Sequence, residues 1–247
     1  MDIDSDDNIL KHIRDVLGNQ PSNFNILEHQ VDVTIQMEYF EYSRNHKVEM
    51  SYEDLIAYEP NLYFPETSYS KIRSSLVGLA SIDRPEAYRI IERYYSKAPP
   101  ELKDWAAMAL QESRMLLESR LLDEHQVFIS TGLGGKDGKL RYFVVLFSTS
   151  EDEFTSTQRN VIKSEFELSL KNCQGKVEKF EFCSSYATMM ALVPLNIAVK
   201  EPFLMAINEC NSLGEFIKSS FLVTNVKPLT REEIDEIIVG RPSKKNT

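Results

Sequence analysis

The sequence predicts an α+β protein, with helices in its first half and mixed helices and strands in its second half. Apolar residues recur at three- and four-residue steps over residues 68–122, which is the period of amphipathic helices. After residue 125, short runs rich in β-branched and aromatic residues alternate with segments of helical period. We therefore expect a helical domain over residues 1–125, an α+β domain over residues 126–240 and a basic tail over residues 241–247.

Three helices with short connections are predicted within residues 68–122. Asp83-Arg84-Pro85 separates the first helix from the second, and Ala98-Pro99-Pro100-Glu101 separates the second from the third. Proline is tolerated in the opening turn of a helix, where the missing N–H costs least, and Asp83 is expected as the N-cap. Connections this short make neighbouring helices roughly antiparallel, so that their apolar stripes are buried against each other.

Residues 76–110, LVGLASIDRPEAYRIIERYYSKAPPELKDWAAMAL, resemble a HEAT-type helical repeat. Repeats of that type stack their helices and leave long faces open to partners, so the resemblance implies protein binding. The alternative is a helical subdomain with no special binding surface, because stacking needs roughly three units to bury a continuous core.

The charge of the chain is concentrated in its first quarter. Residues 1–66 hold 14 acidic and 4 basic side chains, which equals the formal net charge of −10 of the whole chain. Such a segment would complement a basic partner surface, and it is equally what a solvated face that aids solubility would show.

Helices are also predicted before the helical block. One is expected over residues 8–17, ending at Gly18. Residues 31–64 are ambiguous between strand and helix, and we favour helices, with Ser51 as an N-cap and Pro60 closing the helix. The many aromatic residues of this stretch are expected in the core, with a peptide-binding face as the alternative.

Composition indicates a cytoplasmic protein that does not contact membranes. No apolar run approaches the length of a bilayer span, and the N-terminus is acidic where a signal peptide would be basic and then apolar. Cys173, Cys183 and Cys210 are odd in number and lack C-x-x-C spacing, so we expect reduced thiols, with no disulfide framework and no zinc site.

The α+β domain is predicted to begin with two strands, over residues 126–133 and 140–148. The Asp137-Gly138 pair between them suits a tight hairpin turn, because both central positions need positive φ. The glycines of residues 132–138 partly mimic a dinucleotide fingerprint, but that fingerprint requires a following helix, and a strand is expected here. We therefore interpret the segment as a flexible hairpin that contacts a partner through Lys136 and Lys139.

The rest of the domain continues with alternating helices and strands. In order, we expect a helix over 155–172 that Thr155 or Ser156 caps and Gly175 ends, strands over 177–184 and 188–195 with Pro194 closing the second, a helix over 202–211, a strand over 220–226, and a helix over 231–239 that Thr230 caps. The element order β-α-β-β-α-β over residues 140–227 resembles a ferredoxin-like α+β sandwich, which the preceding hairpin strand would extend at one edge. That superfold hosts many functions and implies none of them.

No catalytic, cofactor-binding or metal-binding constellation is predicted. The histidines His12, His29, His46 and His125 are scattered without metal-ligand spacing, and neither a nucleophile elbow nor a P-loop occurs. We therefore expect a protein that is not an enzyme and that needs no cofactor.

The function that these observations favour is that of an interaction or adaptor protein whose helical block binds another protein. Two groups of candidate contact residues follow: the basic ridge Arg89, Arg93 and Lys97, and the hairpin residues Gly134, Gly135, Lys136 and Lys139. The negative charge argues against nucleic acid, although the ridge is where an RNA would bind. The α+β domain could form a homodimer. The alternative is a small-ligand sensor or enzyme with its site under the hairpin 132–139.

Overall fold

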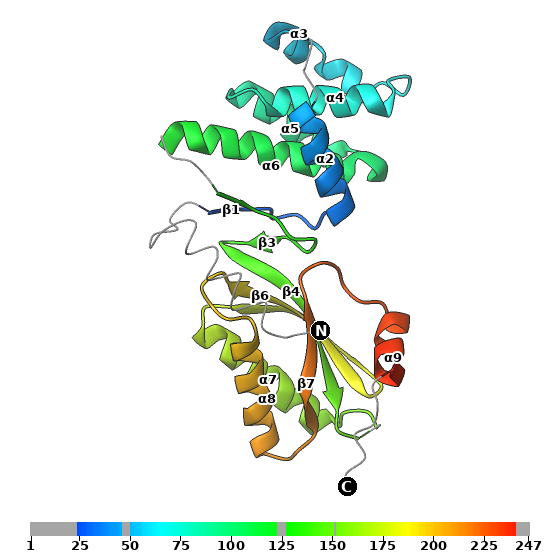
Figure 1. Cartoon of the computed structure of the whole chain (residues 1–247), viewed down its shortest axis with the longest axis vertical. Coiled ribbons are helices and arrows are strands. Elements are labelled where there is room, and N and C mark those ends of the chain that lie inside the picture. Colours follow the sequence, from blue (N-terminus) through cyan, green and yellow to red (C-terminus); the bar gives the residue numbers. More distant parts are fainter. Residues whose placement is uncertain (1–23, 46–49, 123–126, 151, 241–247) are drawn as a thin grey trace. The chain divides into compact units, whose positions relative to one another are not determined.

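The structure is a computed structural model and confirms the α+β class, because helices come first and an antiparallel sheet with helices follows (Figure 1). It describes residues 24–45, 50–122, 127–150 and 152–240. The predicted helix over 8–17, the predicted domain boundary at 125 and the basic tail lie outside these ranges.

The chain divides into two compact units. Unit 1 contains the described residues up to Leu140 together with Pro194–Val199, and unit 2 contains Arg141–Val193 and the described residues from Lys200 onward. The glycine-rich hairpin and the segment that precedes it therefore group with the helices.

Unit 1 consists mainly of helices. Its elements in chain order are β1 (Phe24–Ile26), α2 (Val33–Asn45), α3 (Tyr52–Ala57), the 3-10 helix η1 (Glu59–Tyr63), α4 (Tyr69–Ala80), α5 (Pro85–Lys97), α6 (Pro100–Leu122), β2 (Val127–Ile129) and β3 (Gly135–Lys136). The three helices predicted over 68–122 are confirmed as α4, α5 and α6. Helix α6 contacts α2, α4 and α5, and their apolar faces form one core (Figure 1).

Helices are also confirmed over residues 31–64. Ser51 is the N-cap of α3, and its hydroxyl accepts a hydrogen bond from the amide of Asp54 at 3.2 Å. Helix α3 ends at Ala57 with Tyr58 as its C-cap, at the predicted end, and Pro60 lies in the first turn of the separate helix η1, where its missing N–H costs nothing.

The predicted N-cap of α5 is wrong by one residue. Pro85 opens α5, so Arg84 takes the extended conformation that a following proline favours, and Arg84 is the N-cap without a side-chain cap bond. Asp83 instead forms an ion pair with Arg120 of α6 at 2.9 Å.

The strand predicted over 126–133 does not pair with the strand that follows it. Its described part, β2, pairs in parallel with β1, from Phe24 opposite Val127 to Ile26 opposite Ile129. Only the two residues of β3 pair with the start of β4 (Lys139–Ser148). The turn between them is the predicted Asp137-Gly138 pair, with φ of 51° and 73°.

Unit 2 contains the predicted order β-α-β-β-α-β. Its elements are β4, α7 (Ser156–Asn172), β5 (Lys176–Cys183), β6 (Tyr186–Pro194), α8 (Lys200–Ser212), β7 (Ile217–Thr224) and α9 (Arg231–Gly240). Strand β4 lies beside β6, β6 lies between β4 and β5, and β7 pairs antiparallel with β4. Pro194 ends β6, as predicted.

Different helices pack on the two faces of this sheet. Helices α7 and α8 pack together on one face (Figure 1). The ring of Phe166 contacts that of Phe180 there, and the ring of Phe203 contacts that of Phe221. Helix α9 lies against residues of the opposite face, and its Ile234 is buried there. Among the described residues, no helix has the length and apolar character needed to cross a bilayer.

Most predicted caps of unit 2 are confirmed, and one is wrong. Thr155 forms a capping box with Gln158 at the start of α7. Thr230 and Glu233 form the equivalent box at the start of α9, where the side chain of each accepts a hydrogen bond from the backbone amide of the other. The left-handed residue after α7 is Gln174, with φ of 62°, and not Gly175. Glycine is needed at position 175 because the backbone there passes close to strand β6: a Cβ would lie 2.7 Å from the carbonyl oxygen of Leu192.

Gly135 and Gly138 provide a matched pair of stability tests. A Cβ at Gly135 would overlap the carbonyl oxygen of Lys139 and lie 2.7 Å from Cγ2 of Ile26, whereas a Cβ at Gly138 meets nothing within 4 Å. We expect Gly135→Ala to lower the free energy of unfolding by about 3 kcal/mol. Gly138→Ala should cost about 1 kcal/mol, from its left-handed backbone alone. Urea denaturation measures both, and equal losses would contradict the close approach.

Candidate functional site

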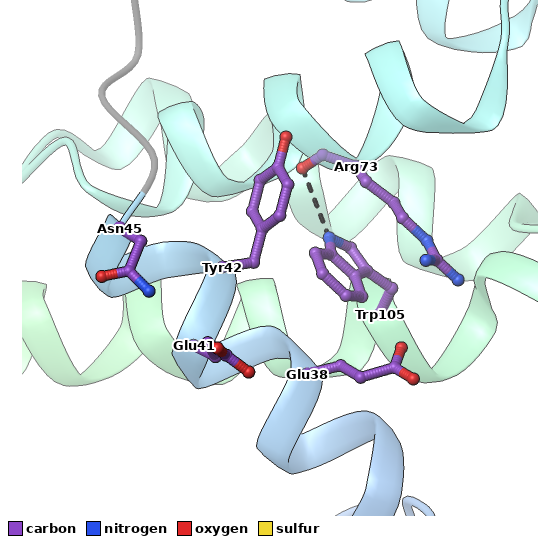
Figure 2. Close-up of a pocket in the computed structure, with 6 residues that line it drawn as sticks. All are labelled: Glu38, Glu41, Tyr42, Asn45, Arg73 and Trp105. Carbon is purple, nitrogen blue, oxygen red and sulfur yellow. Dashed lines mark hydrogen bonds between the residues drawn. The ribbon is translucent and has the colours of Figure 1, made fainter.

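An open hollow of about 410 Å³ lies beside α2 in unit 1 (Figure 2). Its lining residues come from three helices: Glu38, Glu41, Tyr42 and Asn45 from α2, Arg73 from α4 and Trp105 from α6. Glutamates 38 and 41, Tyr42 and Asn45 recur at three- and four-residue steps, so one side of α2 forms a wall of the hollow.

Hydrogen bonds fix where α2 begins. The carboxylate of Asp32 accepts a bond from the amide of Thr34 at 2.8 Å, as an N-terminal cap does. The side-chain amide of Gln36, which is buried, donates to the carbonyl oxygens of Val31 at 2.9 Å and Thr131 at 3.1 Å. These bonds tie the first turn of α2 to the chain after β2.

A carboxylate of α6 fixes the rotation of α2. The hydroxyls of Tyr39 and Ser43 donate to the two oxygens of Glu112, at 2.5 and 2.9 Å. Tyr39 is fully buried, and this burial, followed by the charge of Glu112, raises the pKa of Tyr39 well above 10. The phenol therefore stays protonated as a donor, and the face with Glu38 and Glu41 is turned toward the hollow.

Aromatic rings form the floor of the hollow. Trp105 is 2% exposed, and its ring centroid lies 5.1 Å from that of Tyr39 and 5.4 Å from that of Tyr42. Its indole N–H donates to the carbonyl oxygen of Arg73 at 3.3 Å (Figure 2). The floor is therefore rigid, because the ring is held by a hydrogen bond and by edge contacts.

The floor already binds one guanidinium group. The Cζ atom of Arg73 lies 4.6 Å from the centroid of the Trp105 ring, which is cation–π geometry. The Nε atom of Arg73 is buried, and no described residue accepts a hydrogen bond from it. The arrangement shows that these rings suit a planar cation.

The charges of the hollow do not balance. Two exposed carboxylates, Glu38 and Glu41, stand beside one guanidinium, so the lining carries one excess negative charge. Figure 2 shows Glu38 reaching toward the side of the hollow where Trp105 and Arg73 lie. Carboxylates beside aromatic faces attract ammonium and guanidinium groups. The lining of the hollow therefore favours a positively charged group electrostatically.

An apolar stripe runs along α2 next to the glutamates. Val33, Met37 and Phe40 are 37%, 68% and 37% exposed and follow each other at steps of four and three residues, so they share one helix face. Glu41 lies on the helix surface between this stripe and Asn45. The hollow and the stripe together form one mixed acidic and apolar surface.

The predicted basic ridge exists on α5, but two of its three cations are paired. Arg89 contacts Glu92 at 2.7 Å, and Arg93 forms a two-bond pair with Glu59 of η1, with both distances 2.8 Å. The ammonium of Lys97 lies 5.5 Å from the ring centroid of Tyr63.

The predicted hairpin residues lie in unit 1, against the chain near β1. The amide of Gly135 donates to the carbonyl oxygen of Leu27 at 2.8 Å, and a Cβ at Gly134 would lie 2.8 Å from that same oxygen. Lys136 is exposed, and the ammonium of Lys139 donates to the carbonyl oxygen of Asp137. Both glycines thus permit backbone contact.

Sequence reasoning offered a peptide-binding face within residues 31–64 as an alternative to core, but it did not connect α2 with Arg73 and Trp105. Arg73 and Trp105 lie 32 positions apart and show no motif. The available signals were the single tryptophan of the chain and the acidic and polar face of α2, from Glu38 to Asn45. Within the described residues, no three histidine, cysteine or acidic side chains form a group that could hold a metal.

Unit 2 has a hollow of its own, about 320 Å³ in volume, between the sheet and the start of α9. Phe143, Met190 and Ile234 give it apolar walls. Its charged lining residues are Arg231 and the ion pair of Lys179 with Glu181, at 2.7 Å.

Removing the hydroxyl of Tyr39 tests the attachment of α2. Tyr39→Phe should lower the free energy of unfolding by about 2 kcal/mol, because the carboxylate of Glu112 loses a charge-assisted bond from a buried donor. The hydroxyl of Ser43 donates to the same carboxylate from a more accessible position, so Ser43→Ala should lower the free energy of unfolding by about 1 kcal/mol. Urea denaturation followed by tryptophan fluorescence measures both, and a neutral Tyr39→Phe would refute the role of this bond.

The comparisons with known proteins identify no family. No protein-family model matches the chain, and no curated protein matches it. Among solved structures, similarity is found to a REP-associated tyrosine transposase bound to a REP hairpin, at 8% identity and a TM-score of 0.32, over 42% of this chain and 69% of that chain. A likeness at that score carries no argument about function.

Proposed function

We propose that the protein is an interaction module whose helical unit binds another protein through α2, with the hollow receiving a lysine or arginine side chain of the partner. The observation that supports this most is the charge of the hollow, in which Glu38 and Glu41 outnumber Arg73 beside the ring of Trp105. A second cation would restore neutrality.

The dimensions and chemistry of the hollow fit such a side chain. Lysine and arginine place a charge at the end of a long apolar stem, which can lie along Tyr42 while the charge reaches Glu38 and Glu41. A free metal ion is a poorer occupant, because aromatic rings provide no ligand atoms for it.

The stripe beside the hollow favours a protein partner over a small cation. Met37 is the most exposed of its three residues, and exposed apolar side chains at helical spacing are typical of surfaces that another protein covers. A partner segment that alternates basic and apolar residues would satisfy both parts of this surface.

We also propose that the helical block is of HEAT type and that unit 2 is of ferredoxin-like type. The helical block would present α2 and α5 as HEAT-type helices present their open faces. Unit 2 would be a ferredoxin-like sandwich, supported by the strand neighbours β7, β4, β6 and β5 and by two helices on one face, and it would serve for docking or dimerisation.

A second candidate function is the binding of a small molecule in unit 2. The hollow under α9 favours it, because its walls are apolar and Arg231 supplies one cation beyond the Lys179–Glu181 pair, a combination that suits an apolar anion. Such a ligand should copurify and be released on denaturation, and Met190→Trp, which fills the hollow, should abolish its recovery. Equal recovery from the variant would refute this site.

Neutralising the two glutamates tests the main proposal. The doubly substituted Glu38→Gln, Glu41→Gln protein keeps the shape of the hollow and removes its excess charge, so partner capture should fall about tenfold. The measurement is affinity capture of the tagged protein from its native cells at low salt, quantified by mass spectrometry. High salt should reduce capture by the native protein as well.

The matched control carries Glu53→Gln and Glu86→Gln, two exposed glutamates of α3 and α5 that lie outside the hollow. Its net charge equals that of the test variant, so a loss common to both would indicate a general charge effect and not a site. Recovery of the same proteins in the same amounts by the test variant and the native chain would overturn the proposal.

A further inference from the structure

A guanidinium of the protein itself covers the aromatic ring at the hollow beside α2. The Cζ atom of Arg73 lies 4.6 Å from the ring centroid of Trp105, and Figure 2 shows both side chains at the hollow. The edges of Tyr39 and Tyr42 also contact this ring, which is only 2% exposed. An incoming cation can therefore reach the ring only if the guanidinium of Arg73 leaves it.

The guanidinium of Arg73 is poorly satisfied in this position. Its Nε atom is buried without a hydrogen-bond partner among the described residues, and no described carboxylate forms an ion pair with it. The cost of a buried, unpaired donor is similar in size and opposite in sign to the gain from a cation–π contact. A modest difference in affinity for the ring is therefore enough to displace Arg73.

The carboxylates of the hollow provide a second position for this guanidinium. Glu38 and Glu41 are exposed, and neither forms an ion pair with a described residue. Glu38 reaches toward the side of the hollow where Arg73 and Trp105 lie (Figure 2). Guanidinium and carboxylate groups form planar pairs with two hydrogen bonds. Arg73 can therefore exchange the ring for a carboxylate.

This exchange needs only a turn of one side chain. The indole N–H of Trp105 donates to the backbone carbonyl oxygen of Arg73 at 3.3 Å, which ties α6 to α4 and fixes both the ring and the Cα atom of Arg73. The side chain of Arg73 beyond Cα has several rotatable bonds and is not fully buried. Both helices keep their places while the guanidinium moves.

We propose that Arg73 is an internal competitor for the ring of Trp105, and that the partner side chain which replaces it there is an arginine. This inference rests on the function proposed above, because it concerns the same hollow. In the complex the partner's guanidinium lies on the ring beside one carboxylate, and Arg73 pairs with the other. Two cations then match two carboxylates, and the guanidinium of Arg73 gains the acceptor that it lacks in the free protein.

Lysine fits this exchange less well than arginine. Its ammonium is a compact and strongly hydrated point charge, whereas a guanidinium is planar, weakly hydrated and stacks on aromatic faces. An incoming lysine must displace a group that binds the ring better than it does. The presence of Arg73 on the ring therefore selects for arginine.

The test is fluorescence anisotropy with two labelled peptides, in which either arginine or lysine alternates with leucine, titrated with the full chain. The native chain should bind the arginine peptide more tightly. Arg73→Ala removes the competitor, so it should tighten binding of the arginine peptide about tenfold. Arg73→Lys keeps the charge of the hollow but places a weaker competitor on the ring, so it should also tighten binding, by a smaller factor.

Three controls separate the exchange from a change of charge. High salt screens charges, so the ratio of Arg73→Ala affinity to native affinity should persist there. Acrylamide should quench the fluorescence of Trp105, the single tryptophan of the chain, more strongly in Arg73→Ala, because the ring loses its cover. Arg84→Ala removes a guanidinium near the ring of Tyr52, outside the hollow, and should bind as the native chain does.

The outcomes distinguish the exchange from the function on which it rests. Equal affinity of Arg73→Lys and the native chain for the arginine peptide, or equal affinity of the native chain for both peptides, would overturn the exchange. If Glu38→Gln, Glu41→Gln still weakened binding in that case, the hollow would stand as a cation site. Failure of both peptides to bind, or binding that the glutamine substitutions leave unchanged, would overturn the proposed function and the exchange together.

Discussion

The bonds from Tyr39 and Ser43 to the carboxylate of Glu112 hold α2 on α6, and the candidate surface depends on them. The buried residues of α2 are Gln36 and Tyr39, and both are attached by hydrogen bonds as well as by packing. Apolar contacts alone allow a helix to rotate or slide by small steps, whereas charge-assisted bonds of fixed direction select one orientation. That orientation places the glutamates of α2 at the hollow and its apolar stripe in solvent.

Helix α6 is the element that connects the parts of unit 1. It carries Trp105, which lines the hollow, and Glu112, which binds α2. Its Gln111 and Glu118 form hydrogen bonds with the side chain of Asn25 in β1. Strand β1 in turn pairs with β2, and the carbonyl oxygen of Leu27, just after β1, accepts a hydrogen bond from the amide of Gly135. One long helix thus positions the hollow, the small parallel sheet and the glycine hairpin.

Charge and apolar contact both contribute to the surface proposed at α2. The surface at α2 combines carboxylates with flexible apolar side chains, and it would attract basic segments over a distance limited by the Debye length.

Local signals in the sequence determined most of the elements of this protein. Ser51, Thr155 and Thr230 cap helices as their side chains predict, because a cap is a bond between residues two or three positions apart. The Asp137-Gly138 turn and the end of β6 at Pro194 are equally local. Amphipathic periods placed α4, α5 and α6 and the order of elements in unit 2 in the same way.

Only the tertiary structure decided which distant segments meet. Strand β1 has three residues, too few to show a period, and it exists because it pairs with β2 about a hundred positions away. Gly134 and Gly135 looked like a flexible loop, but both lie against other backbone. A Cβ at Gly134 would lie 2.8 Å from the carbonyl oxygen of Leu27, and a Cβ at Gly135 would overlap the carbonyl oxygen of Lys139. The hollow joins Glu38, Arg73 and Trp105 from three helices. Sequence periodicity records which face of a helix is buried, whereas the neighbour of that face is set by packing across the whole unit.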